Sequence, residues 1–365
     1  MGKRELLIIA AFVVIGAAAW RLTAPPAPPG GRSFSLDTLS EIWRNRNSPQ
    51  PAGHAVVATH GTIEVAATLS ELRLSSVFEV IVEGGDRTDI AWSLDAEARG
   101  NTDEVARKAA ERILLQHDDL GNVLAISVRG PEDTPRTSTL TLQVPSRLAV
   151  RVESARRTRI SSVAGVRLEN LVGNADLKQI AGGIDGAHRN GELSIEDVRD
   201  VTLALIGSTA VIRRPLGAVS ISARNGSTRI EQPAGAVVAE ATNQHLTIVE
   251  SLGDVRVGGV GGEITIERPR RAIDVDARRT RVTLVLDSAV PATVFSAEGG
   301  VTLTLADVSQ VALDVIADVG KIDAQRVGLT PVDRDGRSHL LQAIDGAARV
   351  AIRGEASSIV IAPGK

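Results

Sequence analysis

Residues 255–267 read VRVGGVGGEITIE, and this stretch decides the fold. Val255 and Val257 flank a polar residue, and nine residues further on Ile264 and Ile266 do the same. Because strand side chains alternate between two faces, each apolar–polar–apolar triplet describes a short strand with one buried face. Strands that recur at a constant short spacing predict an all-β fold, namely a β-solenoid of stacked strands.

The nine-residue spacing continues without interruption over ten units. Nineteen of the twenty alternating positions are apolar, whereas 43% of the whole chain is hydrophobic. The first position of each pair is Val201, Ala210, Val219, Thr228, Val237, Leu246, Val255, Ile264, Ile273 or Val282, and the second lies two residues later. We therefore expect these twenty side chains to form the interior of the solenoid.

The outward side chains indicate how many units make one coil. With three units per coil, Arg229 would stack on Arg256, and like charges on neighbouring strands repel each other. With two units, Arg256 stacks on Asp274 instead. The other sheet then carries a column of threonines, Thr247, Thr265 and Thr283. The charges thus favour a coil of about 18 residues with two strands, and about ten coils between 149 and 326.

Glycines recur just before the inward positions. Five of the ten units have a glycine two places before the first inward residue: Gly217, Gly226, Gly235, Gly253 and Gly262. A corner between two sheets requires backbone angles that glycine adopts at low cost, so we expect these glycines to form the corners.

The N-terminus predicts a membrane segment at residues 1–21. Lys3 and Arg4 precede fifteen uncharged residues, Leu6–Trp20, which is the pattern of a secretory signal. The segment could be cleaved after Ala17–Ala19 or retained as an anchor, and the Pro-rich spacer that follows favours the anchor because it would hold a domain away from the membrane.

Four further parts follow this segment. We expect a Pro-rich stalk at 22–55, a strand-rich region with one helix at 56–148, the solenoid at 149–326 and a C-terminal capping segment at 327–365. The helix should follow the capping sequence Asn101–Glu104. Two strand candidates in the last segment, Ala348–Ile352 and Ser358–Ile361, should cover the open end, where unpaired edges invite aggregation.

The step into the solenoid carries a family resemblance. Residues 142–152 read LQVPSRLAVRV and run into repeated Gly-x-Val-x-Ile units. Over about residues 60–325 the chain resembles the bacterial "putative adhesin" family of unknown function, although the regular nine-residue block and the long tail after Val327 depart from it. The resemblance implies a β-solenoid, an envelope-exposed scaffold or adhesion role and often an N-terminal anchor, and it implies no catalytic residues.

Composition argues against several classes of protein. The net charge of −3 gives no electrostatic basis for nucleic-acid binding, and the absence of cysteine excludes disulfides, thiolate metal sites and cysteine nucleophiles. The six histidines show no metal-binding spacing, and no nucleotide-binding loop is present. We therefore expect no metal, no cofactor and no small-molecule substrate.

Two sets of charged residues are candidate sites. The first is a basic patch for an anionic partner, with neutralisation by nearby acidic residues as the alternative. It comprises Arg268, Arg270, Arg271, Arg278, Arg279 and Arg281. The second is a set of outward carboxylates that a β-helix carbohydrate-active enzyme would use for acid–base catalysis, with solvated surface charges as the alternative. It comprises Asp274, Asp276, Asp314, Asp318 and Asp323.

These features predict a protein of the bacterial cell envelope that crosses the inner membrane once. The basic N-terminus should stay inside, with the solenoid on the outer side. We expect an adhesin-like or structural scaffold with a protein partner or self-assembly. A regulatory partner of another envelope protein is the alternative, and a carbohydrate-active enzyme is less favoured because no aromatic platform accompanies the carboxylates.

Overall fold

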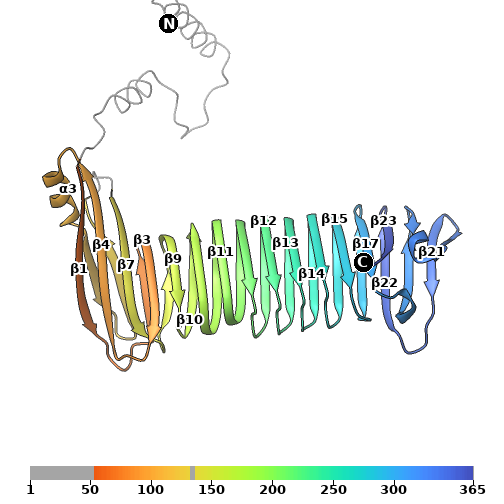
Figure 1. The fold of residues 1–365 in the computed structure, drawn as a ribbon, viewed down its shortest axis with the longest axis horizontal. Helices are drawn as coiled ribbons and strands as arrows, with labels where there is room; N and C mark the ends of the chain where they lie inside the picture. Colours follow the sequence, from red (N-terminus) through yellow and green to blue (C-terminus); the bar gives the residue numbers. More distant parts are fainter. Residues whose placement is uncertain (1–52, 132–135, 365) are drawn as a thin grey trace, which may run out of the picture. The chain divides into compact units, whose positions relative to one another are not determined.

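The computed structural model describes residues 53–131 and 136–364, which belong to one compact unit, Pro51–Lys365. This unit consists almost entirely of β-strands (Figure 1). The predicted membrane segment 1–21 and the predicted stalk up to residue 52 lie outside the described residues. Within the described ranges, no helix is long and apolar enough to span a membrane.

The centre of the structure is a stack of coils with an 18-residue repeat, which confirms the all-β solenoid. Strands β12 (Val219–Glu231), β13 (Val237–Val249) and β14 (Val255–Glu267) pair in parallel, with Val237 opposite Val255 and Ile248 opposite Ile266. Each strand turns once near its middle, where the alternation of buried and exposed residues changes phase. One strand therefore supplies both sheets of one coil.

Neighbouring strands extend this stack in both directions, so that ten coils lie between residues 149 and 323. Before it come β8 (Ala149–Val152), β9 (Ala155–Ser161), β10 (Gly165–Val172) and β11 (Asn174–Arg213). After it come β15 (Ile273–Leu286), β16 (Ala292–Ala297), β17 (Gly300–Leu305), β18 (Val311–Ala317) and β19 (Ile322–Asp323), with short 3₁₀ helices at Val308–Gln310 and Gln325–Val327.

The interior and the outer faces follow the predicted pattern. All twenty alternating positions are buried, and Ile248, Ile266 and Leu284 have no exposed surface. Each such aliphatic side chain stabilises the fold by about 1.5–3 kcal/mol. Arg256 lies over Asp274, with Nε 3.2 Å from Oδ2. The predicted column of threonines on the other sheet is in register.

The corners lie on two opposite edges of the stack, and four of the five predicted glycines do not have the left-handed backbone angles of a corner. Left-handed backbone angles fall on Asn225 and Asn243 along one edge, which we call the asparagine edge, and on Gly207 and Gly261 in the same column. The opposite edge, which we call the proline edge, has Pro215, Pro233 and Pro269 in one column, each directly after a left-handed residue.

Glycine instead permits close approach between coils. Gly235 lacks a left-handed φ, but a Cβ atom placed on it would lie 2.2 Å from the carbonyl oxygen of Gly217 in the preceding coil. Gly253 meets the carbonyl oxygen of Gly235 in the same way. Of the five predicted corner glycines, Gly262 has a left-handed φ, +90°. The physical constraint at most of these positions is therefore steric contact with the neighbouring coil.

One column on the asparagine edge alternates strictly between glycine and a buried polar residue. In stacking order it contains Ser208, Gly226, Gln244, Gly262, Thr280, Gly299, Ser357 and Gly320. The hydroxyl groups of Thr280 and Ser357 each donate to the carbonyl oxygen two residues earlier, at 2.8 and 3.0 Å. These hydroxyl groups thus satisfy corner carbonyls, and the glycines of the neighbouring coils leave room for the polar side chains.

The C-terminal strands lie inside the stack and not over its open end. β22 (Ala348–Glu355) pairs with β16 on one side and β18 on the other, while β23 (Ser358–Pro363) lies between β17 and β19 (Figure 1). The predicted capping position of these two strands is therefore wrong. The end carries the antiparallel hairpin of β20 (Val332–Arg334) and β21 (Arg337–Gln342) on β18.

The N-terminal end, like the C-terminal end, contains one coil that is inserted out of chain order. β2 (Glu71–Ser75) lies between β6 (Val123–Arg129) and β8, and β3 (Val77–Gly85) lies between β7 (Arg136–Pro145) and β9. Antiparallel strands then complete this end: β4 (Asp89–Gly100) on β7, β1 (Gly53–Glu64) on β4, and β5 (Leu114–Asp119) on β6. The helix α3 (Asp103–Ala110), capped by Thr102, buries Ala106, Ala109 and Ala110.

The assignment of faces can be tested with matched aspartates. Ile266→Asp would place a charge between the sheets, and we expect a loss of about 3–5 kcal/mol of stability. Thr265→Asp places the same charge on the outer face and should cost less than about 1 kcal/mol. Urea denaturation measures both; equal midpoints for the two variants would contradict the assignment.

The inserted C-terminal coil can be tested with a disulfide, since the chain has no cysteine. The Oγ atoms of Ser296 and Ser357 lie 3.3 Å apart in the interior. The double variant Ser296→Cys/Ser357→Cys should form an intramolecular disulfide under oxidising conditions and raise the stability by about 4 kcal/mol. Thiol titration and thermal melting provide the readouts. If the tail covered the outer end of the stack, both thiols would remain free.

His188 makes the stability dependent on pH. The ring is fully buried; Nε2 lies 2.7 Å from the carbonyl oxygen of Gly173 and Nδ1 lies 2.9 Å from Ser208 Oγ. A carbonyl oxygen can only accept, so Nε2 carries the proton and Nδ1 accepts from the serine. Burial lowers the pKa of His188 below 6.5. The unfolded chain therefore binds a proton first as the pH falls, and folding loses stability from about pH 6.5 downward.

We expect the free energy of unfolding to fall between pH 7 and pH 5 in the wild type and to fall less in His188→Gln. The carboxylates with lowered pKa values, such as Asp314 and Glu231, contribute at lower pH. His117→Gln, at an exposed position, is the matched control and should keep the wild-type slope. Denaturation at several pH values decides the point, and identical slopes for His188→Gln and the wild type would refute it.

Candidate functional site

The six predicted arginines are exposed, but they do not form a single patch. Arg268, Arg270 and Arg271 lie on the proline edge, whereas Arg278, Arg279 and Arg281 lie on the asparagine edge. In an 18-residue coil, successive corners fall on opposite edges. Six residues, 272–277, lie between the two groups, and an extended strand of that length spans about 20 Å.

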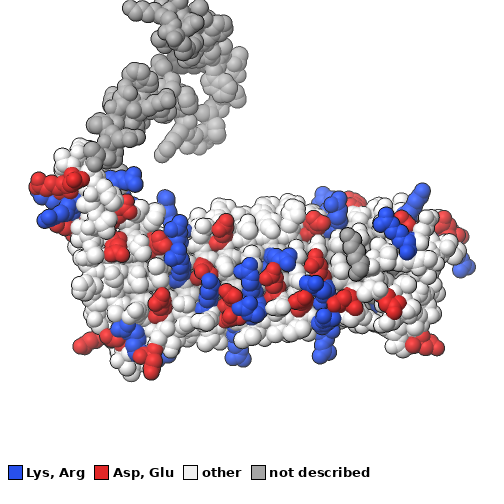
Figure 2. Space-filling model, viewed as in Figure 1, with Lys and Arg blue, Asp and Glu red and all other residues white. Residues whose placement is uncertain are grey.

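The two groups also differ in their partners. On the proline edge, Arg268 pairs with Glu250 at 3.1 Å and Arg270 with Asp287 at 3.2 Å. On the asparagine edge, none of the three arginines forms an ion pair with a described residue. Figure 2 shows basic and acidic side chains interleaved along the visible face, with no continuous basic surface.

Three of the predicted carboxylates are engaged in ion pairs. Asp274 pairs with Arg256, Asp314 with Arg349, and Asp318 with Arg337 and Arg353. The hydrogen bond from Arg349 lowers the pKa of Asp314. A general acid of a glycosidase requires a raised pKa, so Asp314 has the wrong electrostatic environment for that role. Over residues 53–131 and 136–364, no group of three or more His, Asp or Glu side chains is placed to hold a metal ion.

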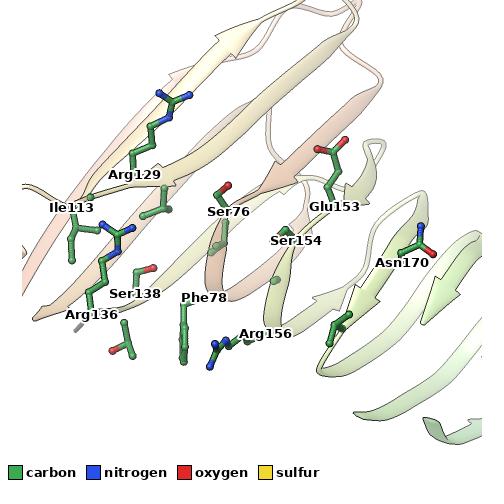
Figure 3. Close-up of a pocket in the computed structure, with 16 residues that line it drawn as sticks. Ser76, Phe78, Ile113, Arg129, Arg136, Ser138, Glu153, Ser154, Arg156 and Asn170 are labelled. Atoms are coloured by element: carbon green, nitrogen blue, oxygen red, sulfur yellow. The ribbon is translucent and has the colours of Figure 1, made fainter. Parts of the chain in front are cut away.

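A cavity of about 410 Å³ lies on the asparagine edge near the N-terminal end of the stack. Its charged wall comes from Arg129 at the end of β6, Arg136 at the start of β7 and Arg156 on β9. Phe78 on β3 lies beside Arg156 (Figure 3). This cavity is the site that the structure adds to those predicted from the sequence.

The cavity is bounded by the corners of three adjacent coils. Ser76 alone joins β2 to β3, in a left-handed conformation with φ of 55°. Glu153 and Ser154 join β8 to β9, and Gly130 after β6 and Arg136 at the start of β7 contribute from the third coil. Buried Val77 and Ala155 contribute to the lining below these corners.

The aromatic ring holds one of the arginines in place. The guanidinium carbon of Arg156 lies 5.4 Å from the centroid of the Phe78 ring, within the range of a cation–π interaction. Phe78 retains 36% of its surface exposed, so the rest of the ring faces solvent. Arg136 donates from Nη1 to the carbonyl oxygen of Pro131.

Positive charge is in excess among the described residues that line the cavity. The carboxylate in its lining, Glu153, is already paired with Arg73 and lies 3.7 Å from Arg151. Within the described part of the chain, Arg129, Arg136 and Arg156 form no ion pair. Their geometry therefore suits an anion that carries a flat or apolar part against Phe78.

The sequence contains little that identifies this site. Its three arginines and its phenylalanine come from three coils and span residues 78–156. The one available signal was Phe78, one of four phenylalanines in the chain, at an outward strand position where an aliphatic or polar residue is usual.

Comparison with known proteins gives no functional assignment. No protein-family model and no curated protein matches the chain. Among solved structures, the chain is similar to a putative adhesin from Parabacteroides distasonis (10% identity, 85% of this chain and 98% of that chain, TM-score 0.35) and to one from Parabacteroides merdae (9%, 83% and 95%, TM-score 0.34). A putative cell adhesion protein from Clostridium sporogenes covers 84% of this chain with a TM-score of 0.20. Because these identities and TM-scores are low, the similarities carry no weight for function.

Proposed function

We propose that this chain is an adhesin-like interaction scaffold of the bacterial envelope, tethered to the inner membrane by its N-terminal segment with the solenoid on the outer side. The observation that supports this proposal is the stack itself, a continuous core with two broad outer sheets. Such a surface suits the binding of a macromolecular partner, either another protein or a second copy of the chain.

The arrangement of charges supports a binding role over catalysis. Arg256, Arg349 and Arg353 neutralise three of the five outward aspartates that an enzyme of this shape would use, namely Asp274, Asp314 and Asp318. Each outer face therefore carries charges of both signs. Such a face favours recognition of a partner with complementary charges over strong attraction of a single anionic polymer.

The position of the tether follows from sequence features. Lys3 and Arg4 precede the apolar segment Leu6–Trp20, and the positive-inside tendency would keep this end in the cytoplasm. The Pro-rich residues that follow would hold the solenoid away from the membrane surface.

Crosslinking from single cysteines tests the scaffold function in intact envelopes. Thr265→Cys places a thiol on an outer sheet, and Ser296→Cys places one in the interior as a matched control. A thiol-reactive, photoactivatable reagent on Cys at position 265 should capture a partner, and the control should capture none.

The identity of the captured molecule separates the alternatives. A surface component of a host or neighbouring cell would support adhesion, and capture of the chain itself would support self-assembly. A signalling membrane protein would instead favour the regulatory role. Equal recovery from the two cysteine positions, or from neither, would contradict a scaffold that binds through its outer sheets.

A further inference from the structure

We propose that the cavity lined by Arg129, Arg136 and Arg156 binds an acidic sugar, that is, a pyranose unit carrying a carboxylate or phosphate group. This inference builds on the proposed function, because it gives the scaffold a ligand class and a binding site. It rests on the charge, size and polarity of the cavity and on the aromatic ring at its rim.

Charge selects an anion. Three guanidinium groups border the cavity without a carboxylate partner in the described structure, and Glu153 is already neutralised by Arg73 and Arg151. The planar guanidinium of arginine binds carboxylate and phosphate oxygens in pairs and retains its charge at any physiological pH. An incoming anion therefore breaks no ion pair between these three arginines and the described residues.

Size and polarity select a sugar. A volume of about 410 Å³ falls at the lower end of the range of small-molecule sites, which suits one or two sugar units. Ser76, Ser154 and Asn170 line the same cavity and can exchange hydrogen bonds with hydroxyl groups. Neither a long apolar ligand nor a bare inorganic ion would use these polar groups and the ring together.

Phe78 and Arg156 form the specific element of the site. The guanidinium already rests against one part of the ring, so Arg156 loses little conformational freedom when it binds an anion. The exposed remainder of Phe78, together with exposed Val172, offers an apolar surface for the C–H face of a pyranose. Figure 3 shows Phe78 and Arg156 side by side on the same side of the cavity.

Isothermal titration of the full chain tests this proposal with matched probes. Methyl glucuronide carries the carboxylate, methyl glucoside is its neutral counterpart, and acetate and inorganic phosphate are the anions alone. We expect methyl glucuronide to bind at least tenfold more tightly than the other three, and the binding should weaken as salt increases. Glucose 6-phosphate distinguishes a phosphate-bearing sugar from a carboxylate-bearing one.

Two variants and a control locate the site. Arg156→Ala should reduce methyl glucuronide affinity at least tenfold, and Phe78→Ala should reduce it about fivefold with no effect on acetate. Arg224→Ala removes an exposed arginine from another coil on the same edge and should leave binding unchanged. Unchanged melting temperatures would show that all three variants fold.

Three results would overturn the proposal. Equal affinity for methyl glucoside would remove the role of charge, equal affinity for acetate or phosphate would mean an adventitious ion only, and equal affinity in Arg156→Ala would place binding elsewhere. The scaffold function fails separately. If the outer-sheet cysteine still captures its partner in an Arg156→Ala background, the scaffold stands whatever the cavity binds.

Discussion

Contact between successive coils at the corners is the constraint on which the rest of the structure depends. Backbones stacked at the spacing of hydrogen-bonded strands leave no room for a Cβ atom above the carbonyl oxygen of the coil below, as at Gly226, Gly235 and Gly262. The asparagine edge resolves this by alternation: a buried hydroxyl such as that of Thr280 or Ser357 donates to the corner carbonyl, and the glycine of the next coil makes room for the side chain. The interior aliphatic residues stabilise the stack, but the corners determine which coils can be neighbours.

The order of the coils at the C-terminal end follows from the same constraint. In chain order Gly299 would stack on Gly320, with no polar side chain between them, whereas the inserted coil places Ser357 there and restores the alternation. An insertion of this kind joins strands far apart in sequence, which slows folding but ties the end of the stack to its interior. The antiparallel strands beyond each insertion then provide the ends of the solenoid.

The period, the 18-residue coil and the inward residues could be predicted because strand alternation is a local property of the chain. The pairing of Arg256 with Asp274 followed from the repeat for the same reason. The order of the coils could not be predicted. The nine-residue period defines the two strand units of each coil, but it does not specify which coil lies next to it. The sequence predicted one basic patch, but the six arginines lie on two opposite edges of the stack. Arg268 and Arg279 are therefore on corners that face away from each other.

The cavity depends on that unpredicted order. Arg129 and Arg136 belong to the coil of β6 and β7, Phe78 to the coil of β2 and β3, and Arg156 to the coil of β8 and β9. If the coils followed the chain, β6 and β7 would separate Phe78 from Arg156, and the contact between ring and guanidinium would not exist. Insertion of β2 and β3 places Phe78 next to Arg156 and leaves the other two arginines on the far side of the ring. The exchange of coils that completes the N-terminal end of the stack therefore also assembles the cavity. There the Phe78 ring lies among three arginines that have no carboxylate partner in the described structure.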